Sequence, residues 1–294
     1  MDNELLLFDR LEVIKKTINK YGADNFYLSY SGGKDSTAIH YLLDEALPNN
    51  NITRVFFNTG IEYQYVVKYV KELASKDNRI VIYNSNVNIQ QMLKNDGYPF
   101  KSKEHSKKLN DYQCGRIAEN IKKYIRNENG FGCPKVLKYQ FTEEFKLKIS
   151  DKCCYRLKKQ IAKRFMKEYN KSIAILGLRQ AEGGQRANHK GCLVLNGNDL
   201  IKFKPLNPMS DEWLKWYIDS RNIKLCELYY EPFNFDRVGC KGCPFVIDLQ
   251  DELDKLEKFL PAERKQCEII WNPVYEEYRR TGYRLEDINQ YKLF

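Results

Sequence analysis

The stretch Asn25–Thr37, which reads NFYLSYSGGKDST, decides the fold. Residues 25–30 predict a β-strand, and apolar residues at helical spacing predict a helix over 37–45. A Gly-Gly turn stands between them. A strand, a glycine-rich turn and a helix start form an anion cradle, because glycines let the backbone approach phosphate oxygens while the helix dipole adds positive potential. The sequence therefore predicts a phosphate-binding loop between strand and helix.

The loop adds side-chain donors to its backbone N–H groups: hydroxyls at three positions and the amine of Lys34. The Walker A spacing is not met, because Gly32-Gly33 directly precede Lys34-Asp35, which excludes an ordinary kinase-like P-loop. The structural alternative is a plain Gly-Gly turn with Asp35 or Ser36 as helix cap. The predicted phosphate-binding residues are Ser31, Gly32, Gly33, Lys34, Asp35, Ser36 and Thr37.

Strands alternate with helices along most of the chain, which indicates an α/β fold with a mostly parallel sheet covered by helices. Further strands are predicted over 54–58, 79–83 and 172–177, and further helices over 65–74, 158–169 and 211–221. From about Leu225 a Cys-bearing loop and two helices, over 251–259 and 262–280, replace this alternation. We therefore expect a nucleotide-binding α/β domain over 1–224 and a small helical module over 225–294.

The chain of 294 residues carries 49 Lys and Arg against 39 Asp and Glu, a net charge of +10. Residues 101–171 hold 20 of the basic and only 8 of the acidic residues, so the whole excess lies in this basic segment. A solvated helical face explains such a segment as well as a polyanionic partner, nucleic acid or a nucleotide, does. No apolar stretch approaches the roughly 18 residues of a membrane span, so we expect a cytoplasmic protein.

The cysteines provide the second strong signal. Nine of them, with no export signal, argue against a disulfide framework. Cys153-Cys154 and the Cys240-Lys-Gly-Cys243 turn can supply four thiolates to a zinc ion or a [4Fe-4S] cluster. Adjacent side chains diverge, which suits separate iron corners better than one small ion, although zinc and ordinary buried thiols stay open.

Several motifs resemble one family. Residues 31–36 resemble the pyrophosphate loop of the adenine nucleotide alpha hydrolase superfamily, which includes the PP-loop ATP pyrophosphatases and the sulfonucleotide (PAPS and APS) reductases. Further segments resemble motifs of the reductase branch, in the same order along the chain. They are residues 55–60 with Glu62, 177–186, 204–208 with Trp213, and 239–244. The two cysteine motifs resemble the iron–sulfur motif of assimilatory APS reductases and of the DNA phosphorothioation ATP pyrophosphatase.

This resemblance implies a doubly wound sheet and assigns roles to residues. Thr59 and Gly60 would lie near the adenosine, although Asn58 stands where many relatives have Asp. Arg179 and Arg186 would complete the phosphate pocket and act with Lys34 in catalysis, because their bidentate donors suit phosphate. The metal ligands would be Cys153, Cys154, Cys240 and Cys243.

Three functions fit the resemblance. The first is an ATP pyrophosphatase that binds ATP with Mg²⁺, releases pyrophosphate and serves sulfur transfer, with nucleic acid as acceptor and a protein as sulfur or electron donor. The second is an APS or PAPS reductase. Such reductases use a C-terminal cysteine, and no cysteine follows Cys267, so the thiol would be Cys267 or a partner's. The third is a non-catalytic sensor of nucleotide and cluster.

Overall fold

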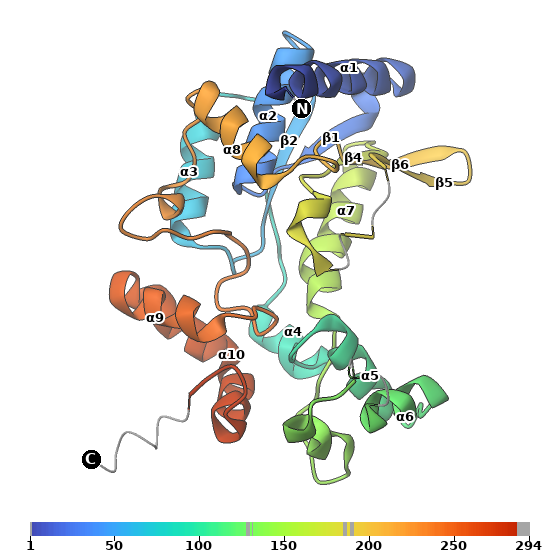
Figure 1. Cartoon of the computed structure of the whole chain (residues 1–294), viewed down its shortest axis with the longest axis vertical. Coiled ribbons are helices and arrows are strands. Elements are labelled where there is room, and N and C mark those ends of the chain that lie inside the picture. Colours follow the sequence, from blue (N-terminus) through green and yellow to red (C-terminus); the bar gives the residue numbers. More distant parts are fainter. Residues whose placement is uncertain (1, 128–129, 131, 185–186, 189–190, 287–294) are drawn as a thin grey trace. The chain divides into compact units, whose positions relative to one another are not determined.

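The computed structural model describes residues 2–127, 130, 132–184, 187–188 and 191–286. These residues form two compact units, each built from two stretches of the chain (Figure 1). Unit 1 comprises residues 1–85 and 161–239, and unit 2 comprises 86–160 and 240–294. The domain boundary predicted at 224/225 differs from this division, because residues 86–160 belong with the C-terminal helices and not with the sheet.

Unit 1 contains a sheet that, over the described residues, has six strands in the order β3-β2-β1-β4-β6-β5. All neighbouring strands are parallel except β5 and β6, which pair antiparallel at one edge. The strands are β1 (Phe26–Ser29), β2 (Thr53–Asn58), β3 (Ile80–Asn84), β4 (Ile173–Ile175), β5 (Leu193–Asn196) and β6 (Asp199–Phe203). The helices are α1 (Asn3–Tyr21), α2 (Lys34–Ala46), α3 (Gln64–Ala74), α7 (Gln160–Glu168) and α8 (Asp211–Ser220), with short turns η1 (Ala23–Asn25), η4 (Gln180–Glu182) and η6 (Glu227–Tyr229).

Helices cover both faces of this sheet, as the resemblance implied. Side chains alternate between faces along a strand. On one face Phe165 of α7 packs with Tyr27, Val55 and Ala174. The neighbouring position Arg54 points to the other face, where its guanidinium meets His40 of α2. The prediction of an α/β, doubly wound, mostly parallel sheet is confirmed.

The predicted strands and helices of unit 1 are all present, with ends shifted by at most a few residues. The hairpin of β5 and β6 was not predicted. Its signal was present in the two residues between the strands, Gly197 and Asn198, because glycine at the first loop position of a two-residue hairpin supplies a positive φ, here +60°. β5 is largely exposed although it reads Leu-Val-Leu-Asn, so it is not one of the buried strands that the other apolar runs predicted.

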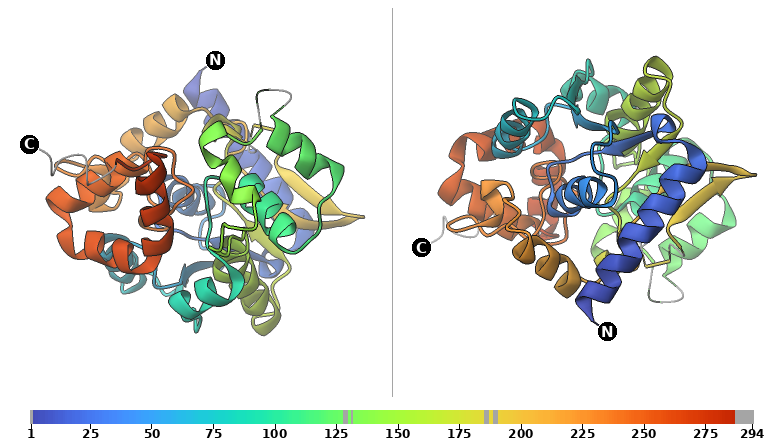
Figure 2. Two further views of the ribbon diagram at one scale, coloured as in Figure 1. Left: turned by 90° about the horizontal axis from the view of Figure 1, so that it is seen from below. Right: turned by 90° about the horizontal axis from the view of Figure 1, so that it is seen from above.

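Unit 2 is helical. It contains α4 (Ile89–Asp96), α5 (Lys103–Gln113), α6 (Glu119–Arg126), η2 (Lys135–Phe141), η3 (Tyr155–Lys159), α9 (Leu249–Phe259) and α10 (Pro261–Thr281). α9 and α10, coloured orange and red, pack against each other (Figure 2). The two stretches of this unit meet where the Tyr278 hydroxyl accepts the Lys101 N–H at 2.7 Å and the Tyr278 ring lies 4.4 Å from that of Phe100. None of the described helices is both long and apolar enough to traverse a bilayer.

Candidate nucleotide site and cysteine cluster

The predicted phosphate loop follows β1 and ends at the first turn of α2, within unit 1. Gly33 is the N-cap of α2 and has no side chain to cap the helix. The Lys34 N–H is donated to the Tyr229 hydroxyl, so the next N–H groups of the first turn are the ones that can meet an anion. Gly32 has a φ of +71°, and a Cβ there would lie 2.8 Å from Val66. Close packing of α3 therefore requires glycine at this position.

Ser36 shapes the loop from inside. Its side chain is buried, accepts the Ser31 N–H at 3.1 Å and donates to the Gly33 carbonyl at 3.0 Å. The Thr37 hydroxyl is also buried and lies 3.2 Å from that of Tyr30. Ser31 and Lys34 are the predicted donors that remain partly or fully exposed. A Cβ at Gly177 would lie 3.0 Å from the Ser36 nitrogen, so the chain after β4 passes directly beside this helix start.

Arg179 lies beside the loop but is engaged by carboxylates. Its side chain is 1% exposed, with Nε 2.5 Å from Asp35 Oδ1 and Nη2 2.6 Å from Asp211 Oδ1. Its Nη1 also donates to the Met209 carbonyl at 3.3 Å. The hydrogen bond from Arg179 is the main cause that lowers the pKa of Asp211, with Lys34 adding to it. Arg186, predicted to share its role, lies outside the described residues.

Tyr229 of η6 belongs to this site, although no local sequence signal predicted it. Its hydroxyl oxygen accepts the N–H of Lys34, the first residue of α2, at 3.1 Å. Burial raises the pKa of this phenol, which keeps its proton. Because the oxygen accepts the Lys34 N–H, the hydroxyl proton is available for an acceptor bound at the loop.

The predicted adenosine-side residues follow β2. Thr59 and Gly60 direct their backbone N–H groups to Glu62 Oε2, at 2.9 and 3.0 Å, and the Thr59 hydroxyl donates to Oε1 at 2.7 Å. Asn58 bonds to Asn84 at the end of β3, 2.9 Å away. Residues 58–62 thus form a loop that the Glu62 side chain closes. This loop lies at the C-terminal ends of the strands, where such folds usually bind their ligands.

All four predicted metal ligands lie in unit 2. Cys153 and Cys154 directly precede η3, a π-helical turn of the kind often found at functional sites. A hydrogen bond between the two lowers the pKa of Cys154, with Lys103 and Lys158 contributing, and raises that of Cys153. The charges of Cys240 and Cys243 raise the pKa of Cys153 further, so the two motifs face each other.

The Cys240–Cys243 turn is held by the two C-terminal helices. Gly242 donates its N–H to Glu252 of α9 at 2.8 Å, and Trp271 of α10 donates to the Lys241 carbonyl at 3.0 Å. Gly242 takes a φ of +58°, and a Cβ there would lie 2.8 Å from Cys267 Sγ. Cys267 is completely buried, and burial raises the pKa of its thiol to about 12, so it does not present a nucleophile.

In the described residues the four predicted cysteines do not surround one common point for a metal ion. Four sulfur ligands suit zinc or iron–sulfur chemistry. Within the part of the chain that the structure describes, no three His, Cys, Asp or Glu side chains are arranged to hold a metal ion. A zinc ion needs all its sulfurs at about 2.3 Å from one point, whereas a cluster binds each sulfur at a different iron.

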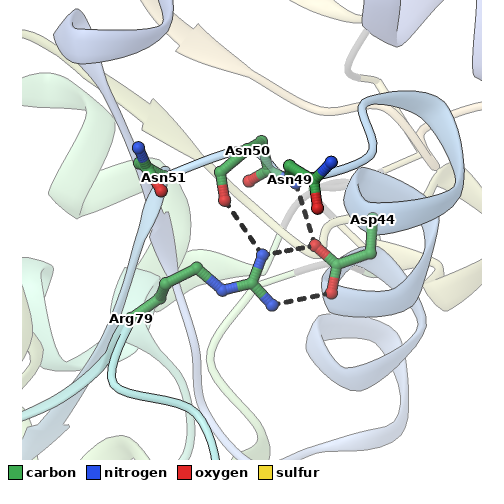
Figure 3. Close-up of a pocket in the computed structure, with 5 residues that line it drawn as sticks. All are labelled: Asp44, Asn49, Asn50, Asn51 and Arg79. Carbon is green, nitrogen blue, oxygen red and sulfur yellow. Dashed lines mark hydrogen bonds and ion pairs between the residues drawn. The ribbon is translucent and has the colours of Figure 1, made fainter.

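Unit 1 also contains a pocket of about 440 Å³, which is lined by polar side chains, several of which bond to one another (Figure 3). Asp44 accepts from Arg79 at 2.7 and 2.9 Å and from Arg54 at 2.7 Å, and Asn50 bonds to the same carboxylate. Arg54 is fully buried, so Asp44 provides the compensating charge that burial requires. Because these charges satisfy one another, we assign the pocket no ligand.

Fold and loop together define an α/β protein whose glycine-rich loop joins the first strand of a mostly parallel sheet to the helix that follows. Residues 25–131 and 134–245 match the family model of the phosphoadenosine phosphosulfate reductase domain. The chain belongs to this phosphoadenosine phosphosulfate (PAPS) reductase family, as its motifs predicted.

Individual similar proteins are more distant. An uncharacterized protein of Methanocaldococcus jannaschii, MJ0973, is 26% identical over 284 residues, 95% of this chain and 54% of that protein. The chain thus spans about half the length of this curated relative. The Candida auris phosphoadenylyl-sulfate reductase structure is 14% identical, with 78% of this chain and 93% of that chain covered and a TM-score of 0.42. The structure of the Methanococcus maripaludis U34-tRNA thiolase NcsA with its [4Fe-4S] cluster is 16% identical. It covers 96% of this chain and 82% of that chain, with a TM-score of 0.43. Likeness at this level carries no information on substrate.

Proposed function

We propose that this protein binds an adenine nucleotide at the loop Ser31–Ser36 and cleaves ATP at the α-phosphate in a sulfur-transfer reaction. The observation that carries the proposal is the loop itself, a glycine-rich helix start directly after β1 in a PAPS reductase-family domain. Its N–H groups and Lys34 offer fixed positive potential to the β- and γ-phosphates, which Mg²⁺ accompanies as part of the ATP substrate.

The proposed chemistry is adenylation of an acceptor. An acceptor oxygen forms a bond to the α-phosphorus, the bond between α-phosphorus and bridging oxygen breaks, and pyrophosphate leaves with the electron pair. A sulfur nucleophile supplied by a donor protein then displaces AMP. The chain's own part is to position the phosphates and to stabilise the charge on the leaving pyrophosphate.

Arg179 has a positioning role in this proposal. Two carboxylates already engage its guanidinium, so it fixes the Asp35 end of the loop and Lys34 provides the cation for the phosphates. Arg186 stays a proposed phosphate ligand on the strength of the motif alone. Thr59 and Gly60 stay proposed adenosine neighbours.

We propose a [4Fe-4S] cluster on Cys153, Cys154, Cys240 and Cys243, with zinc as the alternative ion. When bound, such a cluster supplies redox chemistry. The chain supplies four sulfur ligands and nearby cations, Lys103 and Lys158, which offset the negative charge of the ligated thiolates.

The acceptor we propose is nucleic acid, because the excess positive charge of the chain lies in residues 101–171. The alternative substrate is APS or PAPS, which the family's name favours. In that case the reacting thiol would be an unrecognised one or a partner's, since Cys267 is buried.

Anaerobic calorimetry on the full metal-loaded chain tests these proposals. We expect ATP with Mg²⁺ to bind more tightly than APS or PAPS, and Lys34→Ala to weaken ATP binding about tenfold. Lys68→Ala is the matched control, because Lys68 is an exposed lysine of α3 in the same unit. Tighter binding of APS or PAPS would restore the reductase function, and unchanged ATP affinity in Lys34→Ala would overturn the loop assignment.

A further inference from the structure

A second pocket, of about 610 Å³, lies in unit 2 away from the four cysteines in sequence. Its volume is within the range of ligand sites in proteins. It is formed by η2, the segment that follows η2, and α10. The lining residues are Tyr139, Thr142, Glu144, Phe145, Lys146, Leu147, Glu277 and Arg280.

Aromatic rings and a planar cation dominate this pocket. The Tyr139 and Phe145 rings lie 5.7 Å apart and nearly perpendicular, at 82°. The Arg280 guanidinium lies 4.7 Å from the centre of the Tyr139 ring. This guanidinium is 58% exposed, so it can still stack with a ligand.

One carboxylate fixes the arrangement. Glu277 accepts from the Tyr139 hydroxyl and from Arg280, through Nε at 2.9 Å and Nη2 at 2.8 Å. The carboxylate is mostly buried, and the Arg280 charge is balanced by it. The guanidinium is therefore held over the Tyr139 ring, where it offers a preformed surface to a planar group.

The lining is charge-balanced, with Glu144 and Glu277 against Lys146 and Arg280, so the positive charge that would attract an anionic ligand comes from the surrounding segment. Residues 139–147 belong to the basic segment with its large excess of Lys and Arg, and Lys146 lines the pocket itself. η2 also packs against α5, which carries Lys103, Lys107 and Lys108. Unpaired bases of nucleic acids stack on aromatic rings and on Arg planes while lysines contact the flanking phosphates.

We propose that this pocket receives an unpaired nucleobase of a single-stranded nucleic acid. The inference rests on the proposed function for its biological meaning, since it locates one contact of the proposed acceptor. Phe145 and Arg280 stack with the base, and Lys146 contacts phosphate. Glu144 offers a carboxylate acceptor for a base amino group.

The test measures binding of a fluorescent single-stranded oligonucleotide to the full chain by anisotropy, without ATP. The same backbone without bases, an abasic oligonucleotide, is measured in parallel. We expect Phe145→Ala to weaken binding of the base-bearing oligonucleotide about tenfold and to leave the abasic one unchanged. Arg280→Lys, which keeps the charge but removes the planar group, is expected to act in the same direction. Ile117→Ala, at an exposed apolar residue of the same unit, is the control.

Each other outcome overturns the inference. Equal losses for both oligonucleotides would make Phe145 a structural residue, and no loss in either variant would exclude the pocket. Displacement of the oligonucleotide by AMP would assign the pocket to a free nucleotide. Because ATP is absent, these results are independent of the calorimetry that tests the proposed function.

Discussion

Arg179 ties the first turn of α2 to the first turn of α8, because its guanidinium contacts Asp35 at 2.5 Å and Asp211 at 2.6 Å. The side chain is almost completely buried, so removing it leaves two carboxylates without their cation. We expect Arg179→Ala to lower the free energy of unfolding by about 3 kcal/mol, measured by urea denaturation.

Arg126→Ala is the matched control for this prediction. Arg126 also pairs with a carboxylate, that of Glu119 at 2.8 Å, but both side chains are exposed, at 50% and 59%. Exposed ion pairs contribute less than about 1 kcal/mol, so the control is expected to lose less than that. Equal losses in the two variants would contradict the assignment of Arg179 as a buried positioning residue.

Tyr229 yields a prediction about phosphate binding. Its hydroxyl accepts the Lys34 N–H and keeps a proton for a phosphate oxygen. We expect Tyr229→Phe to weaken binding of pyrophosphate about tenfold, since a hydrogen bond to a charged group is lost. Calorimetry with pyrophosphate measures this. Tyr230→Phe is the control, because its hydroxyl accepts the Leu225 N–H instead; similar affinity of both variants would reduce Tyr229 to a cap of α2.

The strand, turn and helix of Asn25–Thr37 could be predicted because strand periodicity, glycines and a helix start are local signals. The pairing of Arg179 could not, since charge alone does not distinguish a phosphate ligand from a buried ion pair. Tyr229 lies 195 positions from its partner Lys34, and nothing in its local sequence points to the loop. Unit 2 was missed for the same reason, because its two stretches are joined only by tertiary contacts such as that of Lys101 with Tyr278.

The cysteine assignment predicts the metal content of the purified protein. After anaerobic reconstitution we expect about four iron and four sulfide per chain, with visible absorption of an iron–sulfur cluster. Cys240→Ser is expected to lose most of both. Cys114→Ser is the control, because Cys114 is an exposed cysteine outside the two motifs. A measured content of one zinc and no iron per chain would contradict the cluster assignment and favour zinc, the alternative ion.

Two buried histidines predict how stability depends on pH. Burial lowers the pKa of His40 and of His105 to about 4, from an ordinary value of 6.5. In His105, Nε2 lies 2.8 Å from Gln140 Oε1 and Nδ1 lies 3.0 Å from the Tyr124 hydroxyl, an arrangement that suits the neutral ring. Between pH 6.5 and 4 the unfolded chain therefore binds more protons than the folded one, so stability falls as the pH is lowered.

By pH 5 the loss is about 2 kcal/mol for each histidine relative to pH 8, and it is complete below the folded pKa. Urea denaturation of the full chain at pH 8, 6 and 5 measures it. His105→Gln removes one titrating group while keeping polar atoms near Gln140, so its unfolding free energy is expected to depend less steeply on pH than that of the parent. The comparison concerns the slope, because the substitution also changes packing. Identical slopes would show that His105 gains its proton in the folded state as readily as in the unfolded one.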